Sequence, residues 1–262
     1  MVERSGSLNY LNCQNLNFFW DANTQNRVQA VKELSFEAKD GQLIAILGPS
    51  GCGKSTLLQL ICGLEKPGNG EIIINDKKVE GPSSDRGIVF QESCLFPWLS
   101  VLKNVEFGLK MKSNEKTLHK NLALDVLKSV GLENWDKHYP HQLSGGMKQR
   151  VAIARTLVNK PSILLMDEPF ASLDFQTRIL MQEFLLKVWE SFNPIIIMTT
   201  HVVDEAISLA DKILVFSSRP ATILKNIEID SPRPRDIFSE KFNHIRQEIT
   251  EILSTEVLKS IK

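Results

Sequence analysis

The sequence carries no surplus charge of either sign, because its 31 Lys and Arg residues balance its 31 Asp and Glu residues. Proteins that live on nucleic acid or anionic lipid usually show excess positive charge, so a nucleic-acid-binding role is disfavoured. Long apolar runs are also missing: stretches such as 163–166 and 195–198 are far shorter than the roughly 18 residues that a membrane-spanning helix needs. The N-terminus shows no apolar core of a signal peptide, and we therefore expect that another chain must hold this one at any membrane where it works.

Cysteines are few, and Cys13, Cys52, Cys62 and Cys94 form no C-x-x-C pair. Cys52 lies inside a glycine-rich segment, where a disulfide would distort the backbone, so the pattern favours a reducing compartment. With 262 residues and 42% hydrophobic content, the chain can bury a full core. It is near the length at which one domain begins to divide into subdomains.

The glycine-rich segment is the most informative feature of the chain. It fits the pattern G-x-x-x-x-G-K-[ST] and consists of Gly48, Pro49, Ser50, Gly51, Cys52, Gly53, Lys54, Ser55 and Thr56. Its glycines let successive N–H groups point at phosphate oxygens, Lys54 brings charge to the β and γ phosphates, and Ser55 can ligate Mg²⁺. These residues predict a site for a nucleoside triphosphate with magnesium.

The surroundings of this phosphate loop agree with that interpretation. The apolar run 43–47 precedes it as a buried strand, and residues 56–64 continue as a helix with Gly63 near its end. A mere strand-turn-helix corner is the alternative, and the context on both sides makes it weak.

The rest of the chain alternates strands with helices. Residues 8–47 read as short strands with a polar interruption at 21–27, and 70–79 adds more strand, which predicts a small β layer beside the phosphate loop. Further on, the expected order is a strand at 162–167, a helix at 176–191, a strand at 195–200, a helix at 203–210 and a strand at 212–216. This alternation predicts the α/β class with a mainly parallel sheet.

Two segments have helical periodicity instead. Apolar residues from Val101 to Asn159 recur at helical spacing, so a helical insertion interrupts the α/β part. After the turn-rich segment 231–235, apolar residues again follow helical spacing, at Phe238, Phe242, Ile245, Ile249 and Ile252. A docked helix is the simplest interpretation of this tail, with a partner-binding helix as the alternative.

Two adjacent carboxylates, Asp167 and Glu168, end the apolar strand 163–166. In parallel α/β sheets, ligands bind at the carboxyl ends of strands. Asp167 would hold Mg²⁺ through oxygen, directly or through water, while Glu168 would orient and activate the attacking water. Two acids at a strand end are otherwise ordinary solvated charge, but together with a phosphate loop they predict hydrolysis.

A further helix begins after Ser144, which is placed as its N-cap. The following Gly145 and Gly146 let a ligand approach the unsatisfied N–H groups of the first turn. Ser144, Gly145 and Gly146 therefore predict a second anion site.

Together these elements resemble ATP-binding cassette ATPases over roughly residues 8–230. The matching elements, in the family's order, are the phosphate loop, Gln91, L-S-G-G-M at 143–147, Asp167-Glu168, 172–174 and His201. The resemblance implies a P-loop NTPase (RecA-like) core with an antiparallel β layer and a helical insertion subdomain at about 95–159. The ATPase domain would cover 8–232, followed by a C-terminal helical tail at 233–262.

The resemblance also implies an assembly and roles for single residues. In a homodimer or pseudo-dimer, the phosphate loop of one cassette and Ser144-Gly145-Gly146 of the other would sandwich one ATP, so that hydrolysis releases the closed state. Gln91 would contact Mg²⁺ or water, His201 would hold the γ-phosphate, and Asp174 would couple the two sites. Judged singly, Gln91 and His201 would be solvated or core residues, and only their register with the other motifs favours these roles.

Two places depart from the family pattern. An upstream aromatic ring should stack on adenine, and Trp20 is the candidate among residues 16–20, although the following stretch 21–30 is longer than usual. Val202 stands where relatives commonly carry Asp, a change that we expect to leave His201 in place.

Several further segments resemble the nitrate, sulfonate, taurine and bicarbonate branch of importer cassettes. They are 95–101, 181–189, 204–206, 218–220 and 231–235. The resemblance implies a peripheral ATPase at the cytoplasmic face of the membrane, partnered by permease subunits and indirectly by a solute-binding protein. The apolar cluster at 95–99 resembles the surface that receives a permease helix, with plain core filling as its alternative.

The sequence disfavours two other classes of cassette protein. A soluble cassette ATPase of DNA repair or translation would need tandem cassettes, a long coiled coil or a basic face, and none is visible in the sequence. A non-hydrolysing nucleotide-binding regulator would be expected to lack Glu168 or the L-S-G-G element, and both are present.

Overall fold

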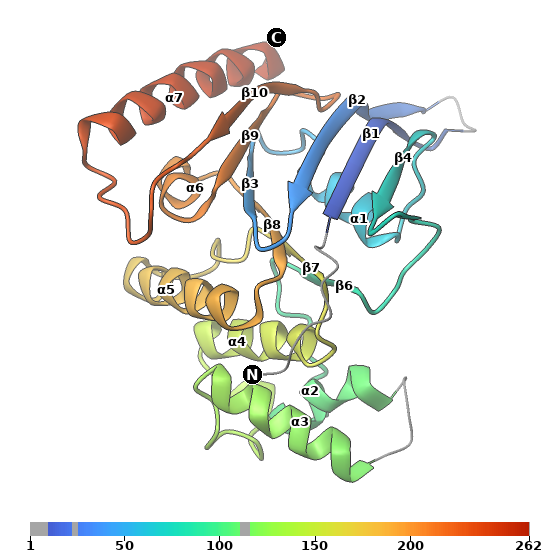
Figure 1. Cartoon of the computed structure of the whole chain (residues 1–262), viewed down its shortest axis with the longest axis vertical. Helices are drawn as coiled ribbons and strands as arrows, with labels where there is room; N and C mark the ends of the chain where they lie inside the picture. Colours follow the sequence, from blue (N-terminus) through green and yellow to red (C-terminus); the bar gives the residue numbers. More distant parts are fainter. Residues whose placement is uncertain (1–9, 23–25, 111–115, 262) are drawn as a thin grey trace. The chain divides into compact units, whose positions relative to one another are not determined.

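The computed structural model describes residues 10–22, 26–110 and 116–261 and divides the chain into two compact units (Figure 1). Unit 1 comprises residues 1–83 and 195–262, and unit 2 comprises residues 84–194. The chain therefore leaves unit 1 after Ser83 and returns to it at Ile195.

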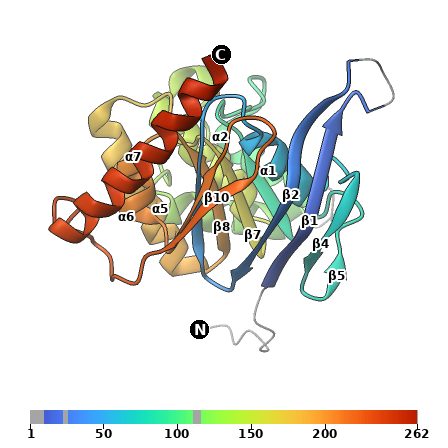
Figure 2. The same ribbon diagram turned by 90° about the horizontal axis from the view of Figure 1, so that it is seen from above.

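Unit 1 contains an antiparallel sheet with the strand order β2-β1-β4-β5 (Figure 2). Its strands are β1 (Tyr10–Trp20), β2 (Val28–Lys39), β4 (Asn69–Ile74) and β5 (Lys77–Lys78). Alternating side chains of β1, among them Leu11 and Cys13, are buried, as expected for a sheet with one covered face. This is the predicted β layer.

Unit 1 also contains strands in the order β10-β9-β3-β8. Here β3 (Leu43–Leu47), β8 (Ile195–Thr200) and β9 (Lys212–Phe216) run parallel, and β10 (Ile223–Glu228) is antiparallel to β9. Every residue of β3 and β8 is buried, which explains why both read as continuous apolar runs. The unit's helices are α1 (Lys54–Cys62), α6 (Val203–Leu209) and α7 (Glu240–Ile261).

Unit 2 combines two parallel strands, β6 (Arg86–Val89) and β7 (Ile163–Asp167), with helices. The helices are α2 (Val101–Lys110), α3 (Lys116–Ser129), the 3-10 helix η1 (Pro140–Gln142), α4 (Gly145–Leu157) and α5 (Phe175–Phe192). Among the apolar residues expected at helical spacing between Val101 and Asn159, Val101, Val105 and Leu127 are buried, whereas Leu118 is 49% exposed. The two units together confirm the predicted α/β class with an antiparallel layer and inserted helices.

The tail forms a helix that packs within unit 1, where α7 contacts α6 and β9 and is joined to β10 by the ion pair of Glu248 with Lys225 (Figures 1 and 2). Phe242 and Ile249 are buried on the packed face. Phe238, the first residue of the predicted stripe, precedes the helix and is 79% exposed. Within the described residues, we find no helix with the length and apolarity required to cross a bilayer.

Candidate nucleotide site

The phosphate loop connects β3 to α1 in unit 1, and its glycines hold backbone conformations that other residues avoid. Gly51 has φ +72° and Gly53, which precedes the first residue of α1, has φ +122°. A Cβ atom at position 53 would lie 2.6 Å from the carbonyl oxygen of Ala30. The curl of the loop at these two positions therefore requires glycine.

Lys54 is held within the curl of the loop. Its side chain is buried, and Nζ donates hydrogen bonds to the carbonyl oxygens of Gly48 at 2.9 Å and Pro49 at 3.0 Å. The ammonium is therefore positioned by the loop itself, as expected of a group that presents positive charge to phosphate.

Cys52 is buried inside the same loop. Burial raises the pKa of its thiol, although the nearby Lys54 opposes the shift. The side chain is therefore a neutral thiol at neutral pH, and adds no negative charge that would repel a phosphate. A Cβ at Gly48 would lie 2.9 Å from the Cys52 Sγ, so the first glycine of the motif makes room for this side chain.

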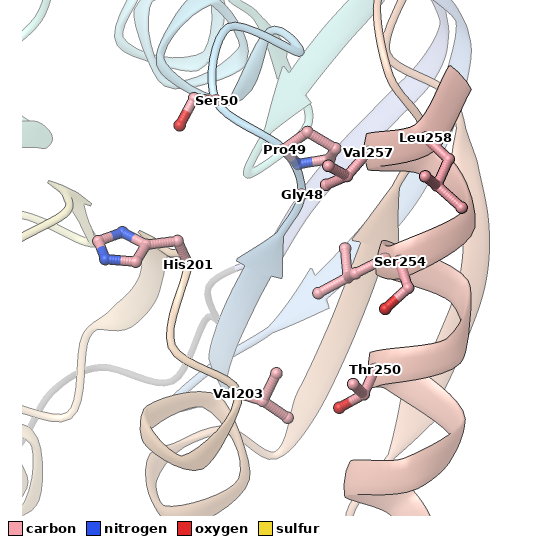
Figure 3. A pocket seen from close by; sticks show the side chains of 10 residues that line it. Gly48, Pro49, Ser50, His201, Val203, Thr250, Ser254, Val257 and Leu258 are labelled. Atoms are coloured by element: carbon pink, nitrogen blue, oxygen red, sulfur yellow. The ribbon is translucent and has the colours of Figure 1, made fainter. Parts of the chain in front are cut away.

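His201 and the start of the phosphate loop line one cavity of about 610 Å³ in unit 1 (Figure 3). His201 follows β8 directly, whereas Gly48, Pro49 and Ser50 follow the neighbouring parallel strand β3. Side chains of α7, including Ser254 and Val257, close the other side of this cavity. His201 and the first residues of the phosphate loop therefore border the same space, and the role of His201 toward the γ-phosphate stays a prediction.

The backbone around His201 is held by hydrogen bonds of the preceding residue, Thr200. The Thr200 hydroxyl donates to the Glu205 carboxylate at 2.6 Å and accepts from the Val202 N–H at 3.0 Å. The side chains of Thr200 and Glu205 are both buried. This bond pair orders the segment that carries His201, while the expectation for Val202 stays a prediction.

Trp20 is the last residue of β1, and the residue is 38% exposed. It packs edge-to-face on Phe18 with ring centroids 4.9 Å apart, while the Arg27 guanidinium covers the ring of Phe19 at 3.7 Å. Of these three rings, Phe18 is buried and Phe19 is covered by a cation, so Trp20 stays the candidate for stacking on adenine.

In unit 2, three predicted residues lie at or just after the carboxyl ends of neighbouring parallel strands. Val89 of β6 pairs with Met166 of β7, and Gln91 and Asp167 come shortly after them. Gln91 is exposed, and Asp167 and Glu168 are half-buried. Since carboxyl ends of parallel strands share one edge of a sheet, this edge gathers oxygen donors of the kind that Mg²⁺ prefers.

Glu168 has a left-handed backbone with φ +44°, unusual for a residue with a side chain. Its carbonyl accepts the N–H of Ala171 at 3.1 Å, which closes the turn after β7. Such strain persists only where the surrounding structure enforces it, and it is concentrated at functional sites.

The predicted second anion site caps α4. The Ser144 hydroxyl accepts the Met147 N–H at 3.3 Å, and Ser144 and Gly145 are exposed. Gly146 is buried, and a Cβ there would lie 2.8 Å from the Thr177 methyl carbon of α5. The first turn of α4 thus adjoins α5 closely because Gly146 has no side chain.

Asp174 caps α5 next to this contact. Its carboxylate accepts the N–H of Thr177 at 3.0 Å and the hydroxyl of Thr177 at 2.7 Å. These hydrogen bonds lower the pKa of Asp174 below its ordinary value. Asp174 and the Ser144–Gly146 turn are therefore linked through a single residue, Thr177.

Sequence reasoning missed one residue that contacts the phosphate loop. Arg219 donates from Nε and Nη2 to the Gly51 carbonyl oxygen at 3.0 and 2.8 Å. The segment 218–220 had been singled out only as part of a family resemblance, and the separation of 168 residues leaves no local signal.

Comparison with known proteins agrees with this geometry. Residues 31–171 match the family model described as ABC transporter. An uncharacterized ABC transporter ATP-binding protein of Methanocaldococcus jannaschii is 48% identical over 96% of this chain and 94% of its own length. The nitrate import ATP-binding protein NrtD of Synechocystis sp. is 45% identical over 84% of this chain and 83% of its own. The aliphatic sulfonates import ATP-binding protein SsuB of Bacillus cereus is 43% identical over 86% of this chain and 88% of its own.

A solved structure extends the likeness to three dimensions. A dimeric ATP-binding cassette in a post-hydrolysis state, bound to ADP and Pi, superposes with a TM-score of 0.73 at 31% identity. The match covers 85% of this chain and 100% of the cassette. It confirms the predicted P-loop NTPase fold and the assignment of an ATPase. The chain therefore belongs to the ABC transporter family, as one of its ATP-hydrolysing cassettes.

Proposed function

We propose that this chain is the ATPase subunit of an importer that takes up a small solute of the nitrate, sulfonate, taurine or bicarbonate type. The observation that carries the proposal is the identity of 43–45%, over most of the chain, to proteins named for nitrate and sulfonate import. In this proposal the chain works at the cytoplasmic face of the membrane as a peripheral subunit. Solute selectivity belongs to separate permease subunits and to a solute-binding protein that acts through them.

In the proposed reaction, the phosphate loop and Lys54 bind the triphosphate and Trp20 stacks on adenine. The hydroxyl, carboxylate and amide oxygens of Ser55, Asp167 and Gln91 are suitable ligands for Mg²⁺, which when bound neutralises phosphate charge. Glu168 accepts a proton from the attacking water, and His201 holds the γ-phosphate from the same cavity as the loop.

The proposed assembly uses a second cassette, identical or related. Ser144 and Gly145 are exposed at the start of α4, so their N–H groups are accessible to a γ-phosphate held by another copy. Asp174, tied to the same turn through Thr177, would sense the occupancy of that site. Cleavage of the shared phosphate would then release the closed dimer.

Permease contact is proposed at the loop that precedes α2. Trp98 is 72% exposed there, whereas Phe96 packs against Phe107 with ring centroids 4.4 Å apart. Arg155 anchors the loop by donating to the carbonyl of Cys94 at 2.6 Å and of Ser93 at 3.0 Å. Phe96 is half-buried and its ring also contacts Trp98 at 5.8 Å between centroids, so an anchored loop presents Trp98 outward on an aromatic support, as a contact site requires.

Deletion of this chain followed by uptake assays with labelled nitrate, sulfonate, taurine and bicarbonate tests the proposal. We expect loss of uptake of one solute, restored by the wild-type chain and not by Glu168→Gln. Trp98→Ala is the matched variant for assembly, expected to keep ATP hydrolysis in the purified chain and to lose co-purification with the permease. Unchanged uptake of all four solutes, with the chain found only in cytosol, would instead support a soluble ATPase.

A further inference from the structure

The turn between β9 and β10 reaches the outer side of the phosphate loop. Arg219 in this turn places both Nε and Nη2 within 3.0 Å of the Gly51 carbonyl oxygen. In a loop that binds phosphate through its N–H groups, the carbonyl oxygens need hydrogen-bond donors other than the ligand. Lys54 donates hydrogen bonds to the carbonyl oxygens of Gly48 and Pro49, and Arg219 donates to that of Gly51.

The turn that carries Arg219 is itself well fixed. The Ser217 hydroxyl donates to the Pro220 carbonyl at 2.9 Å and accepts from the Thr222 N–H at 2.9 Å. Ala221 exchanges backbone bonds with the β2 region, donating to Ala30 at 2.9 Å and accepting from Lys32 at 3.0 Å. Arg219 therefore projects from a rigid support and not from a free loop.

The C-terminal helix holds this turn from the other side. Glu256 of α7 is 3% exposed and accepts hydrogen bonds from the Ser218 N–H at 2.7 Å and the Ser218 hydroxyl at 3.0 Å. The Lys259 ammonium forms an ion pair with the other carboxylate oxygen of Glu256 at 2.6 Å. Burial pushes the pKa of Glu256 upward, but the bonds from Lys259 and Ser218 outweigh it and lower the pKa below its ordinary value. Glu256 is thus a charged acceptor that binds Ser218, the residue that precedes Arg219 in the chain.

We propose that Arg219 is a positioning residue for the phosphate loop, and that Glu256 of the C-terminal helix keeps it in place. Because the peptide unit is planar, fixing the Gly51 carbonyl also fixes the direction of the Cys52 N–H, which donates to Pro49 at 3.3 Å. The loop is thereby held in its curled form before the nucleotide arrives, which lowers the ordering cost of binding. The tail acts on ATP affinity through this contact.

The proposal is tested on the purified full-length chain by ATP titration and steady-state hydrolysis. Loss of two charge-assisted hydrogen bonds at an exposed site predicts that Arg219→Ala raises the KM for ATP about ten-fold. Since Arg219 touches no reacting atom, kcat should stay within about two-fold of wild type. Arg219→Lys keeps the charge and one hydrogen-bond donor, so it should retain part of the ATP affinity. It also provides the test if the alanine variant folds poorly.

A double-mutant cycle separates the contribution of Glu256. Glu256→Ala alone should raise KM by about three-fold, and should add little to Arg219→Ala if it acts through Arg219. Lys225→Ala is the matched control, because Lys225 ties α7 to β10 through Glu248 at 2.6 Å and does not touch the turn. It should leave KM unchanged.

Wild-type KM in Arg219→Ala would overturn the positioning role. Additive effects of the two substitutions, or an equal effect of Lys225→Ala, would overturn the link to the tail. The assay needs neither permease nor solute, so its outcome is independent of the proposed import function.

Discussion

Asn104 of α2 provides a quantitative test of how the proposed permease-contact loop is supported. The residue is fully buried. Its Oδ1 accepts the Phe96 N–H at 2.9 Å, and its Nδ2 donates to the carbonyls of Phe96, Leu99 and Ser100 at 3.0–3.2 Å. One amide side chain therefore satisfies backbone groups of the loop that have no partner in a helix or strand. We expect Asn104→Ala to loosen the loop and to weaken permease binding.

The expected cost follows from which groups lose their partners. The Phe96 carbonyl keeps the Leu99 N–H at 3.1 Å, and the Ser100 carbonyl keeps the Asn104 N–H at 2.8 Å. The loss thus falls on the Phe96 N–H and the Leu99 carbonyl, each worth about 1–3 kcal/mol when left unsatisfied. Since the loop is half-exposed and water can reach it, we expect a loss of about 2–4 kcal/mol.

Urea unfolding, followed by tryptophan fluorescence and by circular dichroism, measures this loss when the two curves coincide. Trp98→Ala is the control, because an exposed side chain should change stability by only about 0.5 kcal/mol while still abolishing permease capture. If Asn104→Ala unfolds within that same margin of wild type, or retains full permease capture, the assigned support role is wrong.

Four further predictions concern the nucleotide site and the tail. Glu168→Gln should retain ATP binding in a fluorescence titration and lose hydrolysis by at least about 100-fold, since only the water-activating carboxylate is removed; unchanged turnover would refute the role. Lys54→Ala should weaken both ATP affinity and turnover, and wild-type values for both would contradict it. Gly53→Ala should destabilise the chain by about 2–4 kcal/mol in thermal unfolding, because its Cβ would meet the Ala30 carbonyl at 2.6 Å. The lowered pKa of Glu256 stabilises the fold above its unfolded pKa of about 4.3, and this contribution disappears as the pH falls through the folded-state value; a Glu256→Gln chain should therefore show a flatter acid-unfolding profile.

The long, fully buried elements were predictable from sequence, and the short or polar ones were not. Strands β3, β7 and β8 could be recognised in the sequence because nearly every side chain in them is apolar and buried. Strand β6 was missed because it has four residues and includes Gly87, which is required there since a Cβ would lie 2.0 Å from the Thr156 methyl carbon. Strand β10 was missed because four of its six side chains are exposed and half of the six are polar.

The same contrast holds for the site. The phosphate loop and the Asp167-Glu168 pair were visible because their chemistry requires fixed residue types at fixed spacing. The bond from Arg219 to Gly51 was not visible, because it joins residues far apart in sequence through a backbone carbonyl, which any residue at position 51 would supply. A hydrogen bond to a backbone group does not restrict which residue supplies that group, so it cannot be predicted from the residue type.

The division of the chain at Ser83 and Ile195 has a consequence for biosynthesis. Unit 2 is one uninterrupted segment, so all of its residues have been translated before any of β8, β9 or β10. Unit 1 is split, and β3 cannot acquire its two parallel neighbours until synthesis has passed residue 216. We therefore expect β3 to lack both of its parallel neighbours while unit 2 is being synthesised, which is the interval in which an apolar strand is most prone to aggregate.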